Sequence, residues 1–221
     1  MHRPWTTYLP EFWDAVGQTL FMTTAAGALV VVVGLTVGTL VYLTAPGSLA
    51  PNPFVYYPLS LVVNLGRSIP FIVLIVLLVP VTRFVVGTMI GEQAALVPLT
   101  VGFAPFFSRL VESSLRELDQ GRIEAARAMG VTKVQFVFRV LLPESLSGIV
   151  AAATIVLVGL VEGTAVAGVV GAGGLGDFAL RFGYQRYITE LMLLSVVAMV
   201  VIVQVVQLSG DTWVRLRRHR R

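Results

Sequence analysis

The sequence of 221 residues contains no cysteine, a single lysine and two histidines, and only 13% of its residues are charged. The absence of cysteine excludes disulfides, thiol catalysis and cysteine metal sites. His2 and His219 lie near the two termini, which argues against a metal or catalytic site built on histidine. Lys133 follows Thr132 and has no glycine beside it, so the phosphate-binding pattern G-x-x-x-x-G-K-[ST] cannot be written anywhere. If the protein works with ATP, another polypeptide must therefore hydrolyse it.

Apolar residues dominate what is present: 56% of the chain is hydrophobic and the mean hydropathy is +0.85. A soluble domain of this size could not bury so much apolar surface, so we expect an all-α integral membrane protein, with one polytopic domain over residues 1–221. The N-terminus carries acids and aromatics and lacks the pattern of a cleaved signal, so the first span is expected to be retained. Five spans near ~20 residues are predicted, at 16–42, 59–81, 94–111, 146–170 and 188–208.

The basic residues predict the orientation of these spans. Eleven lie between the third and fourth spans or after the fifth, and four lie in the loops on the other side. By the positive-inside rule, the loop between the third and fourth spans and the basic tail (211–221) face the cytoplasm. An odd number of spans then places the N-terminus outside. Because the basic residues cluster beside apolar runs, the net charge of +4 does not indicate nucleic-acid binding.

The longest polar stretch, residues 119–143, is expected to hold two short helices. The first covers residues 122–129 and ends at Gly130, the residue type that takes the left-handed conformation after a helix. Thr132 and Gln135 have the spacing of a capping box that opens the second helix. Pro143 is expected to break the register before the next apolar run.

The first of these helices would display Glu124, Ala125, Ala126 and Arg127. Its alanines permit close approach to another protein and its charges fix the orientation, so it could occupy a groove on a partner. An ordinary amphipathic loop at the membrane surface remains an equal alternative on spacing alone.

The same residues resemble a known motif. Glu124-Ala125-Ala126, then Gly130, and then Val140, Leu142 and Pro143 are similar to the EAA motif of permease subunits in bacterial ABC importers, with Val140 where isoleucine is usual. This resemblance implies that residues 119–143 form a coupling segment that docks on an ATP-hydrolysing subunit. Glu124, Ala125, Ala126, Arg127, Gly130 and Pro143 would be its key residues.

Other segments resemble the methionine-importer permeases within that group, notably VNLGRSIPFIVLIVLLVPVTRFVVGTMIG (63–91), VVGAGGLGDFALRFGY and the closing QLSGD. The resemblance implies a homodimer in the bacterial cytoplasmic membrane, with a pathway on its two-fold axis. Two ATPase subunits would bind ATP and magnesium, and an extracytoplasmic binding protein would deliver D- or L-methionine. The chain itself would be a translocation subunit without cofactor or catalytic site, working by alternating access.

Two ionisable side chains lie inside predicted spans, where charges are expensive and therefore functional candidates. Arg67 lies in NLGRSIP, beside Asn64, Ser68 and Pro70, and Glu162 lies deep in the fourth span. In one interpretation the two charges neutralise each other, or bond to backbone freed by a kink at Pro70. In the other, Glu162 lines the pathway and meets a cationic group such as a substrate amine.

The segment GAGGLG (171–176) fits the pattern G-x-G-x-x-G, but it follows a membrane span instead of a strand, so we reject a dinucleotide site. We expect a flexible extracytoplasmic turn at Gly171, Gly173, Gly174 and Gly176. Gly34 and Gly38 have small-residue spacing, which favours tight packing within one subunit over a dimer interface.

Two other functions compete with methionine import. The first is an ABC permease for another solute, such as a quaternary-amine osmolyte, for which Glu162 and nearby aromatics would suit a cation. The second is a secondary transporter working alone, but the sequence shows neither inverted repeats nor paired broken helices. An enzyme is disfavoured because no nucleophile and base occur together in one accessible region.

Overall fold

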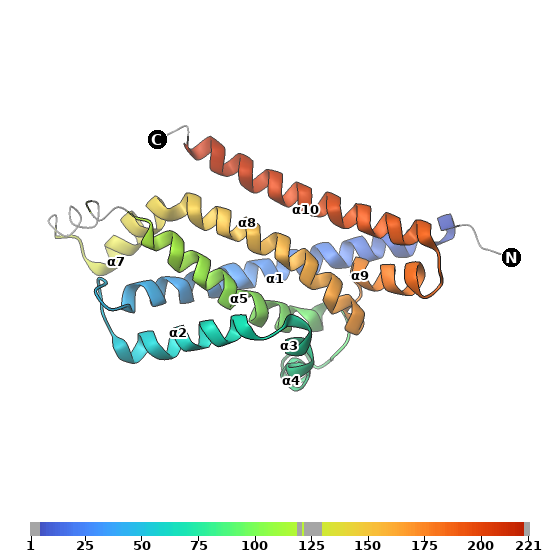
Figure 1. The fold of residues 1–221 in the computed structure, drawn as a ribbon, viewed down its shortest axis with the longest axis horizontal. Coiled ribbons are helices and arrows are strands. Elements are labelled where there is room, and N and C mark those ends of the chain that lie inside the picture. The colour runs from blue at the N-terminus through green and yellow to red at the C-terminus, as the bar shows by residue number, and fades with distance from the viewer. Residues whose placement is uncertain (1–4, 119–120, 122–129, 219–221) are drawn as a thin grey trace.

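The computed structural model describes residues 5–118, 121 and 130–218, and this part of the chain is helical with no strand. Figure 1 shows long helices lying side by side, with short helices at their ends. In chain order the elements are the 3₁₀ turn η1 (Trp5–Tyr8), α1 (Leu9–Thr44), α2 (Pro53–Ser68), α3 (Phe71–Leu77), α4 (Val79–Val86), α5 (Glu92–Arg116), α7 (Lys133–Phe136), the π-helix η2 (Val137–Leu141), α8 (Leu142–Ala167), the π-helix η3 (Gly168–Ala172), α9 (Gly174–Phe178), the π-helix η4 (Ala179–Tyr184) and α10 (Thr189–Arg218).

Four of the helical segments are long and apolar enough to cross a membrane: Trp5–Thr44, Glu92–Arg116, Lys133–Ala172 and Thr189–Arg217. A fifth span exists if α2 and α3, which meet at an angle of 109°, are counted together. The all-helical polytopic fold that we predicted is therefore confirmed.

The break in the second span lies at Pro70. Ile69 has an extended backbone (φ −85°, ψ 125°), as expected for a residue that precedes proline, and Pro70 begins the turn into α3. The predicted kink at Pro70 is confirmed, and the span predicted at 59–81 is bent there by 109°. Its residues are divided among α2, α3 and α4, because a bend this sharp ends one helix and starts another.

The hydrogen-bond register of the helix changes directly before Pro143. The helix continues from Lys133 to Val169, beyond which the backbone of Val170 and Gly171 is no longer helical, and Pro143 lies in the first turn of α8. A π-helical turn, η2, comes directly before it, and the amide of Leu142 donates to the carbonyl of Val137. A proline lacks a donor and crowds the preceding turn. The wider π-helical turn accommodates this, so the helix continues.

The core forms where α1 packs against α5 and α8. A Cβ atom added at Gly34 would lie 2.6 Å from the ring of Phe107, and one at Gly38 would overlap the carbonyl oxygen of Ser108. Phe107 and the neighbouring Val111 are fully buried. The two glycines thus allow the backbones of α1 and α5 to approach closely, which confirms the predicted packing within one subunit.

The ends of the helices define two ends of the molecule. In Figure 1, α7 and the C-terminal end of α10 lie at one end, and η1 and α9 lie at the other. A second apolar cluster, which includes Phe12, Phe178 and Leu191, joins α1 to α9 and α10 at the latter end. Elsewhere α10 is the least covered of the long helices. Of its most apolar stretch, 11% is buried, against 39–44% for the corresponding stretches of the other three.

We expect Gly38→Ala to destabilise the fold. The new methyl group would press on the Ser108 carbonyl and on Val111, and overpacking of this kind costs about 1–3 kcal/mol. Thermal unfolding of the detergent-solubilised protein measures the effect as a lower unfolding temperature. Gly17→Ala is the control, because it lies on the same helix with no atom within 4 Å of the added carbon. An equal response of the two variants would contradict the packing role of Gly38.

Candidate functional site

The described part of the predicted coupling segment begins at Gly130. This glycine has a φ of +68°, the left-handed conformation expected after a helix end. The predicted capping box follows: the Thr132 hydroxyl accepts from the Gln135 amide at 3.3 Å, and the Gln135 side chain accepts from the Thr132 amide at 3.1 Å. This arrangement starts α7 at a defined residue and direction. Glu124, Ala125, Ala126 and Arg127 lie outside the described residues.

On the other side of that segment, α5 ends in a cluster of three charges. The Glu112 carboxylate is buried, and it accepts hydrogen bonds from Arg109 at 2.5 Å and from Arg116 at 2.7 and 3.0 Å. The arginine side chains are about half exposed. A buried carboxylate needs such partners, and the pairs hold the last turns of α5 together before the chain enters the coupling segment.

Arg67, Asn64, Ser68 and Pro70 all lie at the C-terminal end of α2, next to the bend. The Ser68 hydroxyl donates to the Asn64 carbonyl at 2.9 Å. Arg67 is exposed on the protomer, and its guanidinium lies 6.0 Å from the centre of the Phe106 ring. Arg67 therefore rests on an aromatic ring of α5 and forms no ion pair with a described carboxylate.

Glu162 is also exposed on the protomer, on α8. Its carboxylate has neither a hydrogen bond nor an ion pair with any residue that the structure describes. The interpretation in which Glu162 and Arg67 neutralise each other is therefore wrong, because the two side chains are not paired. Each charge instead lies on a part of its helix that the protomer leaves uncovered.

The glycine-rich turn at 171–176 joins η3 to α9. Gly171, Gly173 and Gly174 have φ values of +96°, +80° and +81°, which side chains rarely tolerate. Gly176 has a negative φ but packs against the backbone of Ala165.

Three hydrogen bonds anchor the segment that we expected to be a flexible turn. The Gly174 amide donates to the Gln18 side chain at 2.7 Å, and the Leu175 amide donates to the Thr19 hydroxyl at 2.9 Å. The Gly91 amide donates to the Gly171 carbonyl at 3.0 Å. The turn is therefore tied both to α1 and to the start of α5.

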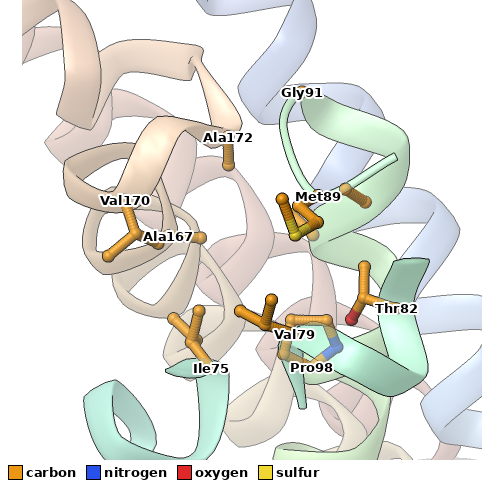
Figure 2. Close-up of a pocket in the computed structure, with 11 residues that line it drawn as sticks. Ile75, Val79, Thr82, Met89, Gly91, Pro98, Ala167, Val170 and Ala172 are labelled. Carbon is orange, nitrogen blue, oxygen red and sulfur yellow. The ribbon is translucent and has the colours of Figure 1, made fainter. Parts of the chain in front are cut away.

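A cavity of about 30 Å³ lies beside α3 and α4, and Figure 2 shows the residues that line it. Its lining includes Ile75 from α3, Val79 from α4, Pro98 from α5 and Ala167 from α8, and Thr82 supplies its one hydroxyl. With no charged side chain, this lining has no group to bind an ionic solute. Among the described residues, no three carboxylates or histidines come together in a way that could hold a metal ion.

Sequence reasoning missed three residues of this architecture. Gln18 and Thr19 anchor a turn more than 150 residues away, and only their adjacency in an apolar helix hinted at a special role. Glu112 could have been found, since the spacing Arg109-x-x-Glu112-x-x-x-Arg116 places both arginines within one helical turn of the carboxylate.

Comparison with known proteins agrees with the geometry. Residues 31–220 match the model of a family described as "Binding-protein-dependent transport system inner membrane component". The chain belongs to this family. It is therefore a membrane component of a transport system, as its resemblance to ABC importer permeases implied.

Individual relatives are similar over most of their length. The chain is 47% identical over 206 residues, 93% of itself and 92% of the relative, to the "Probable D-methionine transport system permease protein MetI" of Vibrio cholerae. It is 43% identical to the "Methionine import system permease protein MetP" of Bacillus subtilis, covering 92% of this chain and 91% of the relative.

Among solved structures, the chain is similar to one titled "Inward facing conformations of the MetNI methionine ABC transporter". The TM-score is 0.93 and the identity 48%, over 98% of this chain and 99% of that one. An amino acid ABC transporter at 20% identity, with a TM-score of 0.74, shares the fold alone.

We expect Thr19→Val to loosen the glycine-rich turn while preserving the shape of α1. The Leu175 amide would lose its acceptor, and a buried donor left unpaired costs about 1–3 kcal/mol. Hydrogen exchange of residues 171–176 should therefore become faster by roughly tenfold or more. Thr24→Val is the control, because its exposed hydroxyl bonds only to carbonyls of its own helix. Unchanged exchange in Thr19→Val would show that the anchor contributes nothing.

Proposed function

We propose that this chain is the membrane-spanning subunit of an ATP-driven importer that moves methionine, or a related amino acid, into the cytoplasm. The observation that carries the proposal is the similarity, over 98% of the chain at 48% identity, to a permease chain of a solved methionine ABC transporter. The names of the Vibrio and Bacillus relatives support the same substrate.

The assembly we propose has two copies of this chain, each a single translocation domain over residues 1–221. Two ATPase subunits, which bind ATP and magnesium, dock on the cytoplasmic side, and a binding protein delivers the solute from outside. The distribution of basic residues supports a cytoplasmic coupling segment and C-terminus and an external N-terminus. The arrangement in Figure 1, with α7 and the end of α10 at one end of the molecule and η1 at the other, fits this orientation.

The helix that continues from Lys133 to Val169 supplies a mechanism for coupling. It makes a rod of about 55 Å at the helical rise per residue. One end begins at the capping box beside the coupling segment, and the other enters the glycine-rich turn that is anchored to α1. A displacement imposed by the ATPase at α7 therefore reaches Glu162 and the opposite end of the molecule as a rigid-body movement, which is what alternating access requires.

Co-purification and uptake together test this function. We expect the tagged chain, extracted gently from its native membrane, to bring down an ATPase with a Walker A motif in equal amount. Proteoliposomes holding that complex, supplied with the binding protein and internal ATP, should accumulate labelled methionine. A chain that purifies alone and moves solute without ATP would overturn the importer assignment, and uptake of a quaternary amine in place of methionine would overturn the substrate.

The coupling residues proposed are Glu124, Ala125, Ala126, Arg127, Gly130 and Pro143. We expect Glu124→Lys to lower the amount of ATPase that co-purifies by roughly tenfold or more, because charge reversal in the centre of a small interface removes a major contact. The ratio of the two proteins after purification is the measurement. Glu190→Lys, the same change on an exposed residue in the first turn of α10, is the control and should keep the ratio of the parent protein. An unaltered ratio in Glu124→Lys would place the docking contact elsewhere.

A further inference from the structure

Glu162 and Arg67, which form no ion pair with a described residue, lie at similar depths in the membrane. Glu162 stands seven residues before Val169, after which the backbone leaves the helical conformation, and this is about 10 Å along a helix. Arg67 stands 14 residues after Pro53, the start of α2, which is about 20 Å. Both lie well inside a hydrocarbon core of about 30 Å.

The helix face that holds Glu162 is not covered by its own chain. Ile155 and Val169, two turns to either side of Glu162, are 55% and 57% exposed. A carboxylate on a lipid-facing stripe at this depth is expensive, and such groups face protein or a water-filled path in membrane proteins. In the proposed dimer, this stripe therefore borders the path between the two copies.

An aromatic wall separates the two charges. Phe103 packs against Gly163, the residue that follows Glu162 in α8, since a Cβ atom at Gly163 would lie 2.8 Å from its ring. Phe103 also meets Phe71 of α3, with ring centres 5.5 Å apart. One helical turn along α5, Phe106 supports Arg67 with a distance of 6.0 Å from guanidinium to ring centre. A carboxylate and a guanidinium thus flank a wall formed by Phe71, Phe103 and Phe106.

From this arrangement we infer that Glu162 and Arg67 form a transient binding site for a zwitterionic amino acid during its passage. The Glu162 carboxylate accepts hydrogen bonds from the α-ammonium group, and the Arg67 guanidinium donates to the α-carboxylate. The aromatic wall contacts an apolar or thioether side chain. This inference rests on the proposed function, and it adds the charge pattern by which the path selects its solute.

The site also explains why neither charge has a partner among the residues that the structure describes. An internal ion pair would satisfy both groups and leave them unable to bind a solute. A solute with both charges replaces that missing pair and desolvates at lower cost than one with a single charge, because each of its groups finds an opposite charge. A quaternary-amine osmolyte with a carboxylate could use the charges as well, but it lacks the ammonium hydrogens that Glu162 would accept.

The test uses proteoliposomes containing the complete transporter, with saturating binding protein and labelled methionine. Glu162→Gln and Arg67→Gln should each lower the methionine moved per ATP hydrolysed by roughly tenfold or more, since each removes one partner of a desolvated charge pair. Glu162→Asp keeps the charge and should restore part of the uptake. Glu11→Gln and Arg83→Gln, the same changes on exposed residues of α1 and α4, are the controls and should match the parent protein.

The outcomes separate this inference from the proposed function. If the parent transporter moves methionine and all variants equal it, the site is absent and the function stands. If the parent moves no methionine, the proposed function fails and the site fails with it. Loss of the co-purifying ATPase in Glu162→Gln and Glu162→Asp alike would make Glu162 structural and overturn the site. The double variant Glu162→Gln with Arg67→Gln gives a further test. If its loss of transport, as a free energy, equals the sum of the losses in the two single variants, the two residues do not act on one solute molecule.

Discussion

The close approach of α1 to α5 is the contact on which the rest of this fold depends. Helices in a membrane gain little from the hydrophobic effect when they meet, so they associate through tight van der Waals packing. Gly34 and Gly38 make this tight packing possible, because neither has a side chain that would hold α5 away from α1. With α5 in place, α8 packs beside it through Gly159 and Gly163 against Phe103, and the bend of the second span closes over Gly102. Every other helix is positioned by this frame.

The frame also joins the two ends of the molecule. The charge cluster at Glu112 and the capping box at Thr132 define where the chain leaves and re-enters the membrane region around the coupling segment. At the opposite end, Gln18 and Thr19 tie the glycine-rich turn to α1. A helix that continues from Lys133 to Val169 connects these two regions. The molecule therefore has defined contacts at both ends and a stiff element between them, which suits the transfer of a movement across the membrane.

Local rules predicted the parts of this structure that local contacts decide. The capping box, the left-handed Gly130 and the break at Pro70 follow from one or a few neighbouring residues, and all three are present. Pro143 shows the limit of such rules. A break of register was expected there, but no residue pattern in the sequence indicated its form, which is a π-helical turn at residues 137–141. The anchor of the glycine turn was missed for a different reason: Gln18 and Leu175 are far apart in the chain, and only the fold brings α1 and α9 together.

The contrast between paired and unpaired charges indicates what the protomer lacks. Glu112 is buried with two arginine partners, and Asp177 is paired with Arg181 at 2.7 Å on the turn that follows the glycines. These two carboxylates are thus satisfied within the chain. At Glu162 and Arg67, deeper in the membrane, no described residue forms such a pair, although these are the positions where an unpaired charge is most expensive. A lipid-exposed protomer would be unstable at both sites, so the surface that holds them must face another protein surface or water. An arrangement that costs energy in the isolated protomer becomes favourable only in an assembly with a polar path, and this ties the two residues to transport.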